Sequence, residues 1–183
     1  MKDLLQARRI SLIVLLVVAA LLVLAVWLRG RAVPSAEKHA ADQHPELFVE
    51  EMGCPRRGTI LENGRRSEEL ALLRSDRYAY DPRDGVRAVR RYQEAEACYR
   101  AAGATSDVIR VRRSITALTA RVNTDYAAAR LNLVNALEQD RWSDALREIH
   151  RLLLLTDHLR RHEYVEWLKK IIGRVRARAS TAV

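Results

Sequence analysis

The longest apolar run in the chain covers residues 10–28. Its 19 residues include no charged side chain, and Ser11 is the only polar one. At about 1.5 Å per residue, a helix of this length covers about 28 Å, close to the hydrocarbon thickness of a bilayer. The run is longer than the apolar core of a cleaved signal peptide, and Trp27, Arg29 and Arg31 at its end suit the headgroup region. We therefore expect an uncleaved transmembrane anchor.

Apolar side chains recur every three or four residues through most of the chain after residue 66, which is the period of a helix. Over about 106–136 this step continues without Gly or Pro and predicts one long helix, with a kink near 123–125 where three cap-forming residues compete with the backbone. No segment shows convincing strand alternation. The expected helices are about 67–80, 86–102, 106–136, 142–155 and 159–176, with a turn at 81–85 and a C-terminal cap at Gly103.

Composition divides the chain into segments around this helical part. We expect a short helix over 45–52 that begins at Pro45, followed by a turn at Asn63 and Gly64. The expected segments are a flank at 1–9, the anchor at 10–28, a linker at 29–44, a short helix and turn-rich stretch at 45–66, a helical-hairpin domain at 67–176 and a disordered tail at 177–183. The predicted fold is all-α, a transmembrane helix followed by an antiparallel helical-hairpin bundle.

The two cysteines leave two interpretations open. Cys54 in an irregular segment and Cys98 on a predicted helix can form one disulfide, which would stabilise the fold by a few kcal/mol in the chain-entropy model. Alternatively, they are two unrelated thiols in a cytosolic domain. The chain has no CxxC and no Cys/His cluster with zinc spacing, so we expect no structural metal.

The orientation of the anchor rests on weaker signals, because three cations stand on each side of the apolar run. The nine-residue N-terminal flank carries the denser charge, and long domains translocate largely regardless of their own charge. A disulfide would also suit an oxidising compartment. We therefore expect a single-pass protein of a bacterial inner membrane, with its N-terminus in the cytoplasm and its C-terminal domain in the periplasm.

Two stretches resemble a known repeat. Residues 141–149, Arg-Trp-Ser-Asp-Ala-Leu-Arg-Glu-Ile, resemble the opening of the second helix of a tetratricopeptide repeat, and residues 91–99 resemble it more weakly. The chain departs from the family at Leu133, where a small residue is usual, and at Asp140, near the usual turn glycine. The resemblance implies a few tetratricopeptide-like hairpins in a protein-binding scaffold. Periodicity alone implies only a helical bundle.

Candidate catalytic and metal-binding groups are few. His158 and His162 are spaced i to i+4 on a predicted helix, and His162-Glu163 begins as a zinc protease motif does, but Glu166 stands where the second His should be. The sequence contains neither GxSxG nor GxxxxGK[ST]. We expect no enzyme activity, no catalytic residue, no cofactor and no metal.

Charge favours a solvated surface over a nucleic-acid site. The chain has 32 Lys plus Arg and 23 Asp plus Glu, a net charge of +9, but aromatics are only 5% of it. Most cations alternate with acids. The one dense basic cluster consists of Lys169, Lys170, Arg174, Arg176 and Arg178. This cluster either meets an anionic membrane surface or only complements the dipole of the last helix.

These observations predict a non-catalytic adaptor for other envelope proteins, held at the lipid bilayer. The grooves expected to bind a partner follow the helices at 86–102 and 142–155. Tyr92, Tyr99 and Trp142 would be the anchors if they are exposed, although their spacing fits a core equally well. The alternatives are a membrane-tethered nucleic-acid-binding protein, which we do not favour, and an envelope enzyme or cell-wall binder.

Overall fold

The computed structural model describes residues 43–50, 52–56 and 58–181, and these form helices without any strand. The predicted anchor at 10–28 lies outside this part of the chain. None of the described helices is long and apolar enough to cross a membrane. The helices are α3 (Ile60–Arg77), α4 (Pro82–Ala101), α5 (Thr105–Glu138), α6 (Trp142–Leu155), the short 3₁₀ helix η1 (Asp157–Leu159) and α7 (Glu163–Thr181). The all-α fold class is therefore confirmed for the described residues.

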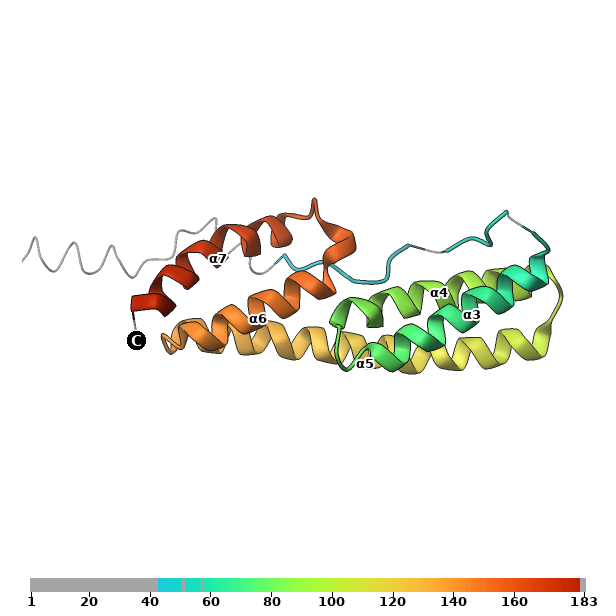
Figure 1. Cartoon of the computed structure of the whole chain (residues 1–183), viewed down its shortest axis with the longest axis horizontal. Coiled ribbons are helices and arrows are strands. Elements are labelled where there is room, and N and C mark those ends of the chain that lie inside the picture. The colour runs from blue at the N-terminus through green and yellow to red at the C-terminus, as the bar shows by residue number, and fades with distance from the viewer. Residues whose placement is uncertain (1–42, 51, 57, 182–183) are drawn as a thin grey trace, which may run out of the picture. The chain divides into compact units, whose positions relative to one another are not determined.

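The 34-residue helix α5 is the longest described helix, and the other helices are arranged along it. Figure 1 shows α4 against its first half and α6 against its second half, while α3 packs on α4 and α7 packs on α6. Successive helices run in opposite directions, because the turns between them are short. One continuous apolar core joins the two halves.

The long helix continues through the expected kink near 123–125. Its helical assignment is unbroken there, and Thr124 Oγ1 donates to the Ala120 carbonyl oxygen at 2.9 Å. The Thr124 hydroxyl therefore bonds to the backbone of α5 and does not cap the start of a second helix.

Helix α3 begins at Ile60, so the prediction that the turn-rich stretch continues to 66 and that the first helix starts at 67 is wrong. A capping box explains the earlier start. Thr59 Oγ1 accepts from the Glu62 N–H at 3.3 Å, and Glu62 Oε2 accepts from the Thr59 N–H at 3.4 Å. The two side chains thereby satisfy backbone donors that the first turn leaves without intrahelical partners.

Asn63 and Gly64 lie inside α3 and do not form the expected turn. The Asn63 side chain donates to the Pro55 carbonyl oxygen at 2.9 Å. Gly64 lies against the Tyr99 ring, and a Cβ atom at this position would come within 2.8 Å of Tyr99 Cε1. The glycine is thus required by a close helix contact and not by a turn.

The turn expected at 81–85 is the beginning of α4. Asp81 is the N-cap and accepts from the Arg83 N–H at 3.0 Å, while Pro82 occupies the first helical position. Aspartate as the cap followed by proline is a favoured helix start. Gly103 has a φ of +71° just after α4, as the predicted cap requires.

Residues 43–50 and 52–56, which we call the strap, form neither helix nor strand, so the helix expected over 45–52 is wrong. Pro45 and Leu47 are both buried. The Nε2 of His158 donates to the Leu47 carbonyl oxygen at 2.9 Å. Cys54 is joined to Cys98 of α4 by a disulfide, with 4.7 Å between their Cα atoms. The strap therefore crosses from the η1 region to α4.

The last helix continues to Thr181, so the expected disorder from 177 is wrong over 177–181. The Arg178 guanidinium lies 4.7 Å from the centre of the Trp142 ring. Ser180 Oγ donates to the Ala177 carbonyl oxygen at 2.8 Å. The cation over the aromatic ring attaches the end of α7 to α6.

Replacing Asp140 by glycine is expected to raise the free energy of unfolding by about 0.5–1 kcal/mol, because Asp140 has a φ of +54°. Urea unfolding followed by circular dichroism measures the change. Gly103→Ala is the matched control: its φ is +71° and no atom lies within 4 Å of an added Cβ, so it should destabilise by about 1 kcal/mol through the backbone alone. An unchanged midpoint for Asp140→Gly would show that the left-handed conformation is not strained.

Candidate functional site: an arginine and leucine surface on α3

The aromatic residues expected to bind a partner pack against other residues of the same chain. Tyr92 and Tyr99 are buried, and the Tyr99 hydroxyl donates to Glu68 Oε2 at 2.7 Å. Burial, followed by this hydrogen bond, raises the pKa of Tyr99 well above its usual range. Trp142 is half-buried beneath Arg178. The interpretation of Tyr92 and Tyr99 as exposed anchors is therefore wrong, and their helical spacing belongs to the core.

The grooves expected along 86–102 and 142–155 are occupied by the chain's own helices. Helix α4 packs against α3, α5 and α6, and α6 packs against α5 and α7. The apolar faces of both helices are accordingly buried in the shared core. A partner would have to bind elsewhere.

The basic residues of α7 do not form one face. At 100° per residue, Lys169, Lys170, Arg174, Arg176 and Arg178 spread over about 200° of the helix circumference. Lys169 pairs with Glu166 at 2.7 Å, and Arg178 stacks on Trp142. At least two of the five residues therefore make contacts within the fold, and the five side chains do not point in one direction. The predicted cluster does not form a single basic surface.

The two histidines are separated by a turn and do not share the predicted helix face. His158 belongs to η1, and burial lowers its pKa. Nδ1 of His162 accepts from the Tyr164 N–H at 3.2 Å, just before α7. Among the described residues, no group of three His, Cys, Asp or Glu side chains is placed to hold a metal ion.

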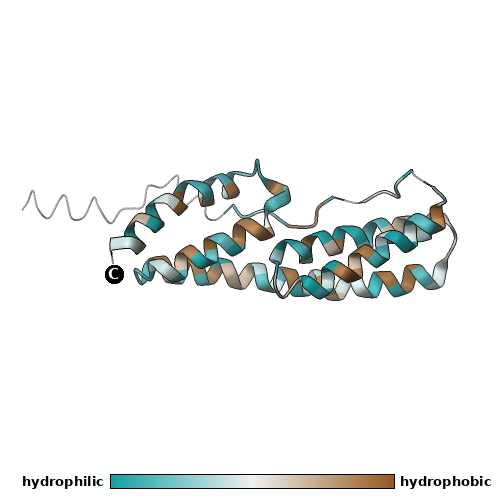
Figure 2. Ribbon diagram, in the orientation of Figure 1, coloured by the Kyte–Doolittle hydropathy of each residue, from teal (hydrophilic) through white to brown (hydrophobic). Residues whose placement is uncertain are grey.

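Helix α3 reverses the usual distribution of apolar residues. Leu70 and Leu73 are 37% and 62% exposed, although leucine normally faces the core of an amphipathic helix. Figure 2 shows apolar bands along α3. The buried residues inside α3 are small or polar: Asn63, Gly64, Ser67 and Ala71. Small side chains allow α3 to lie close to α4, and this close packing leaves no room for the leucines between the helices.

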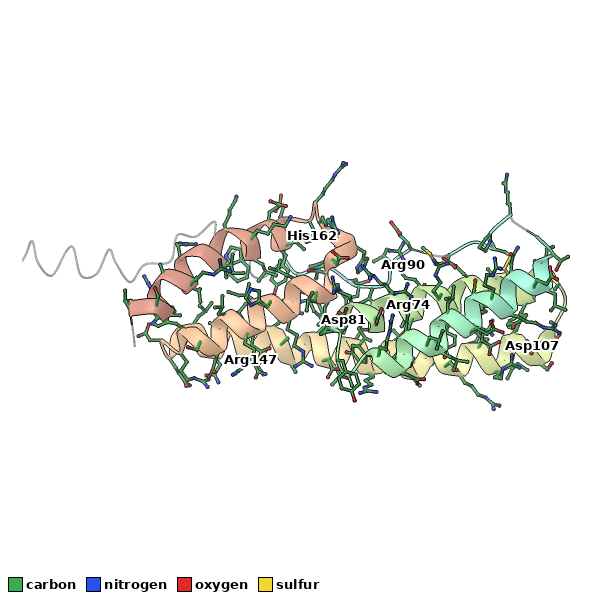
Figure 3. The ribbon with its side chains drawn as sticks, in the orientation of Figure 1. Arg74, Asp81, Arg90, Asp107, Arg147 and His162 are labelled. Carbon is green, nitrogen blue, oxygen red and sulfur yellow. A yellow bond between two sulfur atoms is a disulfide. The ribbon has the colours of Figure 1, made fainter. Side chains whose placement is uncertain are left out.

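The exposed leucines border the first of two hollows near the turn between α3 and α4, where Figure 3 labels Arg74 and Asp81; Arg74 and Arg77 line both hollows. The first has a volume of about 390 Å³ and is lined by Leu70, Leu73, Arg74, Asp76 and Arg77. The second has a volume of about 410 Å³ and is lined by Arg74, Arg77, Tyr80, Asp81, Asp84 and Arg87. Tyr80 is 90% exposed. We call Leu70, Leu73, Arg77, Tyr80 and Arg87 the α3 surface.

Fixed ion pairs hold the guanidinium groups of this region. The buried Asp84 accepts a hydrogen bond from Arg74 Nη1 at 2.9 Å and forms an ion pair with Arg77, whose Nη2 lies 2.9 Å from Asp84 Oδ2. Arg87 Nη2 lies 3.0 Å from Asp157 Oδ2. Each guanidinium has five N–H donors, so these pairs orient the group and leave further donors for an acceptor.

Two acids near the hollows, Asp81 and Asp157, have pKa values below their usual range. Hydrogen bonds from Arg83 lower the pKa of Asp81. Burial opposes ionisation of Asp157, but Arg160 and Arg87 outweigh burial and lower its pKa as well. The region therefore combines apolar side chains with paired charges, which suits recognition of a polypeptide better than acid–base chemistry.

Sequence reasoning missed this surface because leucines in a helix are taken as core by default. One signal was available in the row of small residues at Gly64, Ser67 and Ala71, spaced by three and four. Such a row indicates close helix packing on its own side and therefore exposure of the other side.

No family model matches the sequence, and neither a curated protein nor a solved structure is similar to it. The fold and the site define an all-α protein with an apolar and arginine-rich surface.

Proposed function

We propose that this chain is a membrane-anchored, non-catalytic adaptor that binds another protein through the α3 surface. The observation that carries the proposal is the exposure of Leu70 and Leu73 on a helix that buries small residues instead, with Tyr80 exposed in the turn that follows it. Tyrosine and arginine are enriched among the residues that dominate binding energy at protein interfaces, and apolar side chains around them exclude water. The partner presents apolar side chains to the leucines and a carboxylate to Arg77 or Arg87.

Three further observations support the location and the scaffold role. The apolar run at 10–28 has the length of a membrane span, and residues 141–149 resemble a tetratricopeptide repeat helix. The disulfide between Cys54 and Cys98 suits an oxidising compartment and favours a periplasmic domain. A reporter fused after Val183 tests the orientation, and cytoplasmic activity of that reporter would contradict it.

Changing Leu70 and Leu73 to serine is expected to reduce partner binding at least tenfold, because the loss of two anchors removes about 1–2 kcal/mol each. A photo-crosslinking residue placed at Tyr80 in the full chain, in its native membranes, measures the yield of a discrete protein adduct. The double variant should lose most of this adduct while its far-ultraviolet circular dichroism stays unchanged.

Leu61→Ser with Leu72→Ser is the matched control. Both leucines are exposed and belong to the same helix, but position 72 lies about 200° from position 70 around it. This control should retain the adduct. Equal loss in both variants, or no adduct at Tyr80, would exclude the α3 surface as the binding site.

A further inference from the structure

Helix α5 carries an uncharged row of exposed residues on its outer side. The row comprises Ala117, Ala120, Thr124, Ala127, Leu131 and Val134, all of them exposed, and we call it the α5 seam. Leu131 is 70% exposed and Val134 is 46% exposed. In a chain with 30% charged residues, the seam has no charge over about five turns.

The spacing of the seam is that of a coiled coil. Its successive steps are 3, 4, 3, 4 and 3 residues, the alternation that keeps side chains on one line when two helices wind around each other. No helix of the described residues covers this row, since α4 and α6 pack on the buried side of α5. The seam is therefore a complete helix-packing face without a partner helix among the residues of 43–181 that the structure describes.

The sizes of the seam residues favour a second copy of the same helix in the antiparallel direction. We align the two antiparallel helices so that the two-fold axis passes between positions 125 and 126 of each. Ala117 then lies opposite Val134 of the other copy, and Ala120 lies opposite Leu131. Thr124 then lies opposite Ala127. Each large side chain meets a small one, so the distance between the helices stays constant, whereas a parallel pair would place leucine on leucine and alanine on alanine.

The charges at the two ends of the seam favour the same arrangement. Arg113 precedes the seam by one step and Glu138 follows it by one step, and both are exposed. Neither forms an ion pair within the described part of the chain. In the antiparallel register Arg113 of one copy lies opposite Glu138 of the other, at both ends of the pair. A parallel pair would instead place like charges together.

The flanking positions add no repulsion. Arg121 and Arg130 stay on their own chain, 5.1 Å from the Tyr78 ring centre and 5.5 Å from the Tyr126 ring centre. In the same register these arginines face Ala128 and Asn123 of the other copy. We infer that two copies of this chain form a two-fold homodimer by antiparallel packing of their α5 seams. This inference is independent of the proposed function, since the α3 surface shares no residue with the seam.

Sedimentation velocity of the full chain in detergent micelles tests the dimer. The wild type should sediment as a dimer at micromolar concentration, and Leu131→Glu should raise the dissociation constant more than tenfold. Leu72→Glu, an equally drastic change at an exposed leucine of α3, should leave the dimer intact. Circular dichroism of each variant shows whether the helices are retained. A monomeric wild type, or a dimer unaffected by Leu131→Glu, would overturn the inference.

A charge exchange tests the antiparallel direction. Arg113→Glu alone and Glu138→Arg alone each place like charges opposite one another and should raise the dissociation constant three- to tenfold. The chain with both changes restores opposite charges and should return to within twofold of the wild type. In a parallel dimer each single change would only replace one pair of like charges by another pair of like charges. If the single changes did not weaken the dimer and the double change did not restore it, the antiparallel register would be overturned.

Discussion

Removal of the disulfide between Cys54 and Cys98 is expected to lower the free energy of unfolding by about 4 kcal/mol. The bond joins residues separated by 44 positions, and the chain-entropy model assigns about 4 kcal/mol to a loop of this size. The suitable variant is Cys54→Ser with Cys98→Ala, because Cys98 is fully buried and alanine introduces no polar atom there. Urea unfolding monitored by circular dichroism gives the difference.

Reduction of the wild type provides the control for this variant. Reduced wild type and the double variant should unfold at the same urea concentration, and reductant should not affect the double variant. The destabilised chain should also lose the strap first, because its other contacts are non-covalent. They include hydrogen bonds to the carbonyl oxygens of Leu47 and Pro55, an exposed ion pair to Glu50 and apolar packing of Leu47. Identical unfolding of oxidised and reduced wild type would contradict a stabilising role.

Gly85→Ala is expected to destabilise the fold by about 2–3 kcal/mol. A Cβ atom at Gly85 would overlap Cδ2 of Tyr78. The tyrosine ring cannot move aside easily, since its hydroxyl donates to Asp125 Oδ2 at 2.6 Å and the Arg121 guanidinium stacks on its face. Overpacking of this kind outweighs the roughly 1 kcal/mol that alanine gains over glycine in a helix. The measurement is the urea midpoint of the variant.

Gly173→Ala separates the steric effect from helix propensity. Gly173 lies within α7, and no atom lies within 4 Å of an added Cβ there. This variant should therefore be more stable by about 0.5–1 kcal/mol, in the opposite direction to Gly85→Ala. Stabilisation by both variants would mean that Tyr78 adjusts freely and that Gly85 has no packing role.

The parts of the fold that the sequence predicted well are those where local pattern and tertiary packing agree. Helix α6 has the predicted limits, 142–155, because Ala145, Ile149 and Leu152 follow the helical step and are all buried. The long helix α5 was recognised for the same reason, since its buried residues keep that step for many turns without glycine or proline.

The parts that were missed depend on contacts distant in sequence. Gly64 resembles a turn residue until Tyr99, 35 positions later, is known to lie against it. Leu47 resembles part of a helix until His158 is known to bind its carbonyl oxygen. The exposure of Leu70 and Leu73 likewise follows from how closely α3 lies to α4, a distance that no local pattern contains.

The strap also determines how a pulling force applied at residue 43 enters the fold. Such a force would peel the strap from η1 and α4 only as far as Cys54, where the covalent bond passes it to Cys98 in the middle of the chain. Helix α3, which comes next in sequence, lies within the closed loop and carries none of this load. With the disulfide intact, the strap is a short tether of fixed length between whatever precedes residue 43 and the core helix α4.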